Sequence, residues 1–256
     1  MTNMIDTAAA SPAVSPATVP PTGVPEPVPT CAACRKPQPL CVCATIEPVA
    51  TRLAVVVLQH PREQDRELGT ATLTHLQLTN SVLKIGLSWS GLKRIIGREV
   101  EMRRWAVLYL GTAGQAPEQT DQEVLMVDGQ GKAMPDQRRL RAGLEGIILL
   151  DGNWEQAKTL WWRNPWLLKA QRMVLNPGFR SRYGNLRRQP RRQGLSTLEA
   201  VALCLSRLEG RPELFDHLLK PFDALIERAN TLQVAPETAP TAKPARVPRG
   251  RGGRRA

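Results

Sequence analysis

The stretch that decides the fold is a short apolar run followed at once by a turn and a helix start, Gly146-Ile147-Ile148-Leu149-Leu150-Asp151-Gly152-Asn153-Trp154-Glu155-Gln156-Ala157-Lys158. Four consecutive aliphatic residues, Ile147 to Leu150, are typical of a strand that is buried on both faces of a parallel sheet. Asn153 can cap a helix that begins at Trp154. Asp151 would then lie at the carboxyl edge of a sheet, where open α/β proteins bind ligands. Taken alone, this stretch favours a purely structural role for Asp151 in the turn and helix cap. The rest of the chain favours a functional role instead.

Other apolar runs indicate the remaining strands of an α/β fold. The run Leu53–Gln59 is rich in β-branched residues and stops at His60-Pro61, because proline cannot continue strand pairing. Further strands are expected at Trp105–Leu110, Glu123–Val127 and Arg172–Leu175. Apolar periodicity predicts helices at 69–83, 138–142, 154–162, from Ser196 onward, and from Pro212 to about Asn230.

Composition indicates a globular protein with unusual ends. The chain has 256 residues, is 42% hydrophobic and contains 22 prolines, many of them near its ends. It has no apolar run of about 18 residues, so a membrane-spanning helix is not expected. Residues 1–30 contain neither Lys nor Arg and do not resemble a signal peptide. We therefore expect a cytoplasmic protein that does not bind membranes.

The sequence divides into four parts. Residues 1–30 are proline-rich and should be disordered, and residues 31–50 contain a cysteine cluster. Residues 51–230 form the main α/β domain, and residues 231–256 form a basic tail that should also be disordered.

The net charge of +12 favours a polyanionic partner, most often nucleic acid. Residues 180–192 contain six arginines around Tyr183, with Gly and Pro that prevent a regular helix. Arginine suits phosphate and an aromatic ring can stack on a base, so this loop is a candidate for RNA binding. A solvated charged loop on a protein that is simply basic is the alternative.

Four of the five cysteines lie in a CxxC…CxC pattern, at Cys31, Cys34, Cys41 and Cys43. Thiolates at this spacing can converge on one tetrahedral zinc, and four of them leave no open position for catalysis. The zinc would be structural, either pinning the N-terminal segment or forming a knuckle that touches nucleic acid. Disulfides are the weaker alternative in a cytosolic chain. Cys204 lies among helical apolar residues and is expected in the core.

Two further features could face a ligand. His60 ends a strand next to a charged loop, although a lone histidine is more often a structural residue. Ser196 and Glu199 form a capping box, and the free amides of that helix start could hold a carboxylate or phosphate.

Together these pieces resemble the DTW-domain family and are similar to tRNA-uridine aminocarboxypropyltransferases. The matching segments are, in chain order, the CxxC…CxC cluster, His60-Pro61-x-Glu63, Leu108-Tyr109-Leu110, Leu150-Asp151-Gly152-Asn153-Trp154, Tyr183-x-x-Leu186-Arg187-x-x-Pro190 and Leu195-Ser196-Thr197-Leu198-Glu199-Ala200. They run from residue 31 to about 230. Asn153 stands where the family signature has Thr; it keeps the cap but does not offer the same hydroxyl.

The resemblance implies a SPOUT-like fold, in which a knotted, mostly parallel sheet binds S-adenosylmethionine. It also implies transfer of the 3-amino-3-carboxypropyl group to N3 of a tRNA uridine, with release of methylthioadenosine. Asp151 is the candidate base for the N3 proton. The full set of site residues implied is catalytic Asp151 and Trp154; cofactor-binding Leu110, Gly111, Asp151, Pro177, Ser196 and Thr197; and RNA-binding His60, Arg180, Tyr183 and Arg187.

Three other functions remain open at this point. A SPOUT-type RNA methyltransferase would use the same co-substrate but release S-adenosylhomocysteine. A related aminocarboxypropyltransferase would modify ribosomal RNA. A non-catalytic zinc-knuckle protein would bind RNA but not S-adenosylmethionine.

Overall fold

The structure is a computed structural model and describes residues 28–108, 122–187 and 194–237. Its strands are β1 (Ala54–Gln59), β2 (Ser81–Ile85), β3 (Trp105–Leu108), β4 (Val124–Val127), β5 (Gly146–Asp151) and β6 (Gln171–Leu175). Its α-helices are α1 (Ala71–Gln77), α2 (Leu92–Ile96), α3 (Gln137–Ala142), α4 (Trp154–Arg163), α5 (Thr197–Leu208) and α6 (Glu213–Thr231). Short 3₁₀ helices are η1 (Gln38–Leu40), η2 (Cys43–Thr45), η3 (Pro61–Glu63), η4 (Met102–Arg104) and η5 (Pro165–Lys169).

Within the described residues the strands form one mixed sheet in the order β2-β1-β5-β3-β6-β4. All neighbouring pairs are parallel except β4 and β6. Strand β5 lies between β1 and β3, and its residues Gly146 to Leu150 are buried. The predicted α/β class and the predicted two-sided burial of this strand are confirmed.

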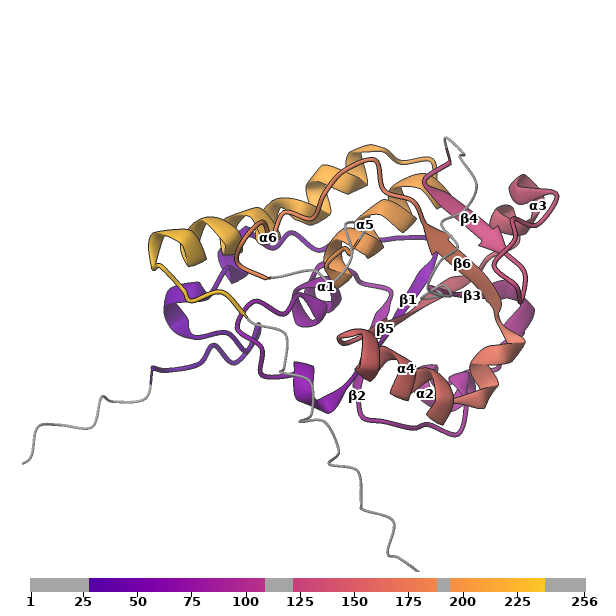
Figure 1. Ribbon diagram of the computed structural model, residues 1–256, viewed down its shortest axis with the longest axis horizontal. Helices are drawn as coiled ribbons and strands as arrows, with labels where there is room; N and C mark the ends of the chain where they lie inside the picture. Colours follow the sequence, from indigo (N-terminus) through magenta and orange to yellow (C-terminus); the bar gives the residue numbers. More distant parts are fainter. Residues whose placement is uncertain (1–27, 109–121, 188–193, 238–256) are drawn as a thin grey trace, which may run out of the picture.

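Helices cover both faces of the sheet (Figure 1). Val55 and Val57 point to the face that carries α1, α5 and α6, whereas Val56 and Leu58 point to the face that carries α2 and α4. The alternation follows from the two-residue period of a strand. Because both faces are covered, every residue of β1 is buried.

Gly146 opens β5 where the sheet leaves no room for a side chain. A Cβ at this position would lie 2.4 Å from the Trp105 ring and 2.7 Å from the Ala54 carbonyl oxygen. The absence of a side chain therefore lets the indole of β3 pack across the start of the central strand.

The expected helix at 69–83 was too long. Helix α1 ends at Gln77, and Ser81 begins β2, which pairs in parallel with β1. Ser81 Oγ donates to the carbonyls of His75 and Leu78 and so closes the turn between the two elements. Leu78 and Val82 are four residues apart, which fits the period of a helix, but Val82 lies on β2. Helix α2 (Leu92–Ile96), which has only five residues, was not expected from the sequence.

The C-terminal part of the described chain is packed against the domain. Glu237 N donates to Leu186 O at 2.8 Å, and a Glu237 carboxylate oxygen accepts from Leu68 N at 3.2 Å. A disordered tail is expected from residue 231 onward, but the segment 231–237 is held to the body of the protein. Residues 238–256 and 1–27 lie outside the described residues.

Candidate active site at the carboxyl edge of the sheet

The centre of the candidate site is a hydrogen-bonded pair formed by the last residues of two neighbouring strands, of which Gln59 is buried and Asp151 is half-buried. Gln59 ends β1 and Asp151 ends β5, and the parallel register places them opposite one another. Both continue the odd-numbered row that faces α5. Gln59 Nε2 donates to Asp151 Oδ2 at 2.9 Å, and the Thr197 hydroxyl donates to Asp151 Oδ1. Both carboxylate oxygens therefore accept hydrogen bonds from neutral groups.

These surroundings make Asp151 more basic than an ordinary carboxylate. Burial raises the pKa of Asp151, and the hydrogen bonds from Thr197 and Gln59 offset this in part. Among the described residues, no Lys or Arg side chain is hydrogen-bonded to Asp151. A carboxylate with a raised pKa and two fixed hydrogen bonds can accept a proton from a ligand at this edge.

The turn after Asp151 is fixed by a capping box. Asn153 accepts from Gln156 N at 3.0 Å, and the Gln156 side chain accepts from Asn153 N at 2.5 Å. A Cβ on Gly152 would lie 2.8 Å from Gln156 Cβ, so the turn needs glycine. The predicted cap at Asn153 is confirmed.

The start of α5 has a second capping box, which changes one expectation. Ser196 Oγ accepts from Glu199 N at 3.1 Å, and Leu198 N donates to Thr70 Oγ1 at 3.2 Å. Ser196 itself is only 4% exposed. These two amides are already bonded within the protein, so the expectation that this helix start holds the carboxylate of a ligand was wrong for them. Thr197 reaches the site through its side chain instead.

A second set of charges lies beside the first. Arg187 donates to Glu63 at 2.7 Å and lies 3.6 Å from a Glu237 carboxylate oxygen. The Glu63 side chain is 4% exposed. This ion cluster joins three parts of the chain: η3 through Glu63, the segment after β6 through Arg187, and the end of the described chain through Glu237.

Tyr183 belongs to the core. Its side chain is fully buried, its hydroxyl donates to Leu68 O at 2.7 Å, and its ring packs edge-on against Phe222. The Arg187 guanidinium covers the ring at 5.6 Å from its centroid. The proposed stacking of Tyr183 on a base is wrong, since neither ring face is available, and Arg187 is engaged by two carboxylates. The clue that sequence reasoning passed over is the spacing of Tyr183 and Leu186, which packs both into the core.

The other expected RNA-binding residues lie nearer the surface. His60 is half-buried, and its Nδ1 accepts from Arg62 N at 3.2 Å, which caps η3. Burial, followed by the charge of Arg62, lowers the pKa of His60. Arg180 is exposed beyond the end of β6.

Of the remaining residues expected to contact a ligand, some lie within the described part of the chain and some do not. Trp154 begins α4 directly after the Asp151 turn, and Pro177 follows β6; both are half-buried. Leu110 and Gly111, with the rest of the Gly111–Gly114 loop, lie outside the described residues.

The four N-terminal cysteines form a separate site. The sulfur atoms of Cys31, Cys34, Cys41 and Cys43 all lie within 4.8 Å of one another, and none is in a disulfide. Cys31 and Cys43 are 3.7 Å apart, close to the ~3.8 Å edge of a zinc–thiolate tetrahedron with 2.3 Å bonds. Amides of Cys34 and Ala33 lower the pKa of Cys31 to about 6, which favours its thiolate. The cluster could hold a metal ion such as zinc.

This segment is anchored to the rest of the chain on two sides. The Arg228 side chain of α6 donates to Cys41 O, and η1 and η2 pack against α6. On the other side, Lys36 Nζ donates to Glu67 O at 2.6 Å and to Gly69 O at 2.7 Å.

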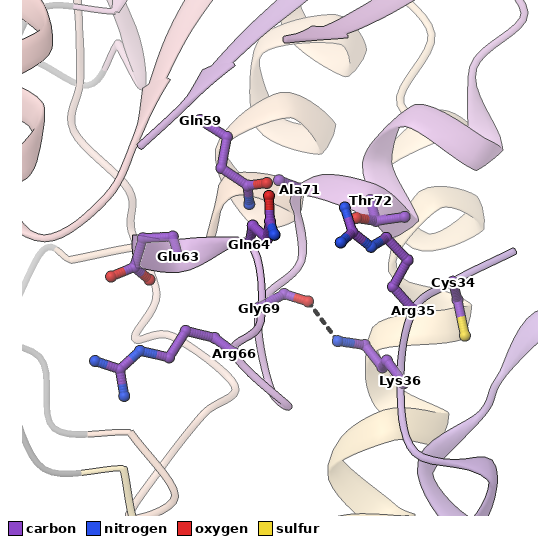
Figure 2. Close-up of a pocket in the computed structure, with 10 residues that line it drawn as sticks. All are labelled: Cys34, Arg35, Lys36, Gln59, Glu63, Gln64, Arg66, Gly69, Ala71 and Thr72. Carbon is purple, nitrogen blue, oxygen red and sulfur yellow. Dashed lines mark hydrogen bonds between the residues drawn. The ribbon is translucent and has the colours of Figure 1, made fainter. Parts of the chain in front are cut away.

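A pocket lies between the cysteine segment and the sheet edge (Figure 2). Gln59 and Glu63 line one side, and Arg35, Lys36 and Gly69 line the other. Sequence reasoning missed Gln59 as a site residue. The available signal was its position: it ends a strand on the same face as Asp151, but only the pairing of β1 with β5 makes the two side chains neighbours.

None of the helices within residues 28–108, 122–187 and 194–237 has the length and apolar character needed to span a bilayer.

Comparison with known proteins identifies relatives of the chain. It is 30% identical over 197 residues to tRNA-uridine aminocarboxypropyltransferase 2 of Drosophila melanogaster, a match that covers 76% of this chain and 72% of the fly protein. It is also 30% identical over 201 residues to the Mus musculus protein of the same name, covering 77% of this chain and 62% of the mouse protein. No solved structure matches significantly. The family model described as the DTW domain matches residues 28–230, and the chain therefore belongs to the DTW-domain family.

Proposed function

We propose that this protein is a tRNA-uridine aminocarboxypropyltransferase that moves the 3-amino-3-carboxypropyl group of S-adenosylmethionine to N3 of a uridine. The observation that carries the proposal is Asp151, a carboxylate with a raised pKa, held at the carboxyl edge of the sheet by Gln59 and Thr197. The names of the fly and mouse relatives support the same reaction.

The reaction is a nucleophilic substitution at the methylene carbon next to the sulfonium. N3 forms the new bond to this carbon, the carbon–sulfur bond breaks, and its electron pair stays on sulfur in methylthioadenosine. The N3 proton goes to Asp151. The imide is mostly protonated at neutral pH, so a positioned base raises the fraction of nucleophile available for attack. Trp154, at the start of α4, would bound the site beside Asp151.

We propose a SPOUT-like, knotted arrangement around the co-substrate, built on the mostly parallel sheet. Strands β5, β3 and β6 are parallel neighbours, so their carboxyl ends lie at one edge of the sheet. Asp151 ends β5, and Pro177 and Leu110–Gly111 follow β6 and β3 in the sequence; we propose these residues as contacts of S-adenosylmethionine together with Thr197. Ligands of open α/β sheets bind at such an edge.

We propose that tRNA approaches over the exposed basic residues near this edge. Arg180 is exposed, and His60 lies at the end of β1 next to Asp151 O, which accepts from His60 N at 2.9 Å. The arginines of residues 238–256 would add attraction that does not depend on sequence. Removal of 238–256 should flatten the dependence of log affinity on log salt without changing the product; an unchanged slope would show that these residues do not contact RNA.

We propose that the four cysteines hold a structural zinc. Four thiolates close the coordination shell, so the ion would fix the segment against α6 and take no part in the transfer. Elemental analysis of protein purified without added metal should give one zinc per chain. Less than half an equivalent of metal, with disulfides detected by mass, would contradict this.

The reaction itself is tested by product analysis. Purified protein, S-adenosylmethionine and unmodified tRNA should yield 3-(3-amino-3-carboxypropyl)uridine and an equal amount of methylthioadenosine. Formation of S-adenosylhomocysteine and a methylated base would replace the proposal with an RNA methyltransferase. Binding of tRNA without binding of S-adenosylmethionine would indicate a non-catalytic RNA-binding protein.

A further inference from the structure

The Gln59 side chain has one end bonded and one end free. Its Nε2 donates to Asp151, but its Oε1 is buried and has no hydrogen-bond partner among the described residues. The residue is 3% exposed. A buried carbonyl oxygen without a donor is unfavourable, so such an atom at a site indicates a missing partner.

The orientation of the amide follows from the state of Asp151. An ionised carboxylate has no proton to donate, so the end of Gln59 that faces it must be the NH₂ group. The carbonyl oxygen is then left for another group. The missing partner must therefore donate a hydrogen bond.

Burial alone does not identify a ligand site, as Gln77 shows. Gln77 is 1% exposed, and both polar atoms of its side chain lack partners among the described residues. It lies in α1 and does not line the pocket. Gln59 does line the pocket, and Figure 2 shows its amide directed between the loop that carries Gln64 and the start of α1 at Ala71.

The pocket presents opposite charges on different sides. Gln59 and Glu63 lie at the sheet edge, and the Arg35 guanidinium lies on the side of the cysteine segment; the Arg66 side chain extends away from Gln59. Glu63 is already paired with Arg187, whereas Gln59 Oε1 is a buried acceptor at this pocket that has no partner among the described residues. A small zwitterion, with an ammonium and a carboxylate on one carbon, matches this distribution of charge.

We propose that Gln59 is a substrate-binding residue whose Oε1 accepts a hydrogen bond from the ammonium of the amino-acid end of S-adenosylmethionine. This assignment rests on the proposed function. The ammonium nitrogen is three bonds from the carbon that is attacked, so one amide would hold both the base, through Nε2, and the group being transferred, through Oε1. Arg35 would face the carboxylate of the same group.

The test compares two ligands that differ at the amino-acid end. S-adenosylhomocysteine keeps this end, whereas methylthioadenosine lacks it. Calorimetry with Gln59→Met should show affinity for S-adenosylhomocysteine weakened about tenfold or more, the usual effect of losing a hydrogen bond to a charged group. Affinity for methylthioadenosine should stay within about twofold. The matched control, Gln77→Met, removes a buried amide away from the pocket and should change neither affinity.

A second variant, Gln59→Glu, separates loss of the hydrogen bond from loss of the fold. Gln59→Glu keeps acceptor oxygens in the same place, so it should restore affinity for S-adenosylhomocysteine relative to Gln59→Met. Its turnover should nevertheless fall, because two adjacent carboxylates would share a proton. A Gln59→Glu protein that unfolds like wild type but binds S-adenosylhomocysteine as weakly as Gln59→Met would overturn the assignment.

The outcomes separate this assignment from the proposed function. Equal weakening of both ligands by Gln59→Met, or no weakening of either, overturns the Gln59 assignment while wild-type transfer activity stands. A raised KM for tRNA with unchanged ligand affinities would also overturn it and move the contact to RNA. Wild-type protein that binds neither ligand overturns the proposed function and the assignment together.

Discussion

Two carboxylates, the buried Glu63 and the half-buried Asp151, lie close to the same pocket and have opposite kinds of neighbours. The negative charge of Glu63 is balanced by the guanidinium of Arg187, which also lies near Glu237. Asp151 is bonded by the Gln59 amide and the Thr197 hydroxyl, which carry no charge. A balanced charge stabilises the fold only while its partner is present, whereas an unbalanced one has a raised pKa and can exchange a proton. The pair distinguishes a structural carboxylate from a reactive one.

The largest expected effect is on the structural side of this comparison. Arg187→Met leaves Glu63 buried without a cation, and breaking such a pair costs about 3–5 kcal/mol. Urea unfolding should show this loss in the free energy of unfolding. The exposed Arg180→Met should cost less than about 0.5 kcal/mol. Similar losses from both variants would mean that the Glu63 pair contributes little to the fold.

Next in size is the effect on the reactive side. Asp151→Asn keeps the shape of the side chain and removes the base, so turnover should fall on the order of 100-fold or more. Affinity for S-adenosylhomocysteine should change little. Glu155→Gln, which removes an exposed carboxylate in the first turn of α4, should leave turnover unchanged. Near-full turnover of Asp151→Asn would refute the assignment of the base.

A smaller effect is expected from Thr197→Val, which removes one hydrogen bond from the ionised form of Asp151 without changing the shape much. The hydrogen bond lowers the pKa of Asp151, so its loss should raise that pKa further. The pH–rate profile should shift to higher pH, and turnover at neutral pH should drop about tenfold. A drop in turnover with no shift of the profile would assign Thr197 to ligand contact alone.

The smallest effect concerns stability and pH. The pKa of Asp151 is raised in the folded protein, so the native state binds the proton more tightly than the unfolded state does. Stability from this group is present below about pH 4, the unfolded pKa of Asp, and is lost as pH rises through the folded pKa. Asp151→Asn should therefore be more stable than wild type at pH 7 and lose that advantage near pH 3. Equal melting temperatures at both pH values would show that burial of the charge has no net effect.

Strand and helix types near the site could be predicted because their residues carry local signals. The run Ile147–Leu150 and the caps Asn153 and Ser196 determine β5, α4 and α5 through burial, turn chemistry and amide bonding. The end of α1 could not be predicted, because Leu78 and Val82 fit a helical period and only the pairing of β2 with β1 decides otherwise.

The site was predictable where one residue carries the chemistry, as at Asp151 and the cysteines. It was not predictable where contacts cross the chain. Gln59 becomes part of the site only through register with a strand 92 residues away, and Tyr183 lost its expected role because Phe222 and Leu68 enclose it. A dense arginine sequence indicates charge but does not show that Arg187 is neutralised by Glu63 and Glu237.

The pairing of Gln59 with Asp151 also has a consequence for how the central strands find their alignment. β1 and β5 are apolar on both faces, so a shift of one residue between them would still bury aliphatic side chains, and hydrophobicity alone specifies their register weakly. The polar ends remove this ambiguity, because only the native alignment joins the amide to the carboxylate. Deleting one residue between Val55 and Leu58 would preserve an apolar strand but turn Gln59 toward α4. The hydrogen bond between Gln59 and Asp151 thus helps to fix the register of β1 and β5 during folding. Selection for catalysis at this edge would therefore also preserve the length of both strands.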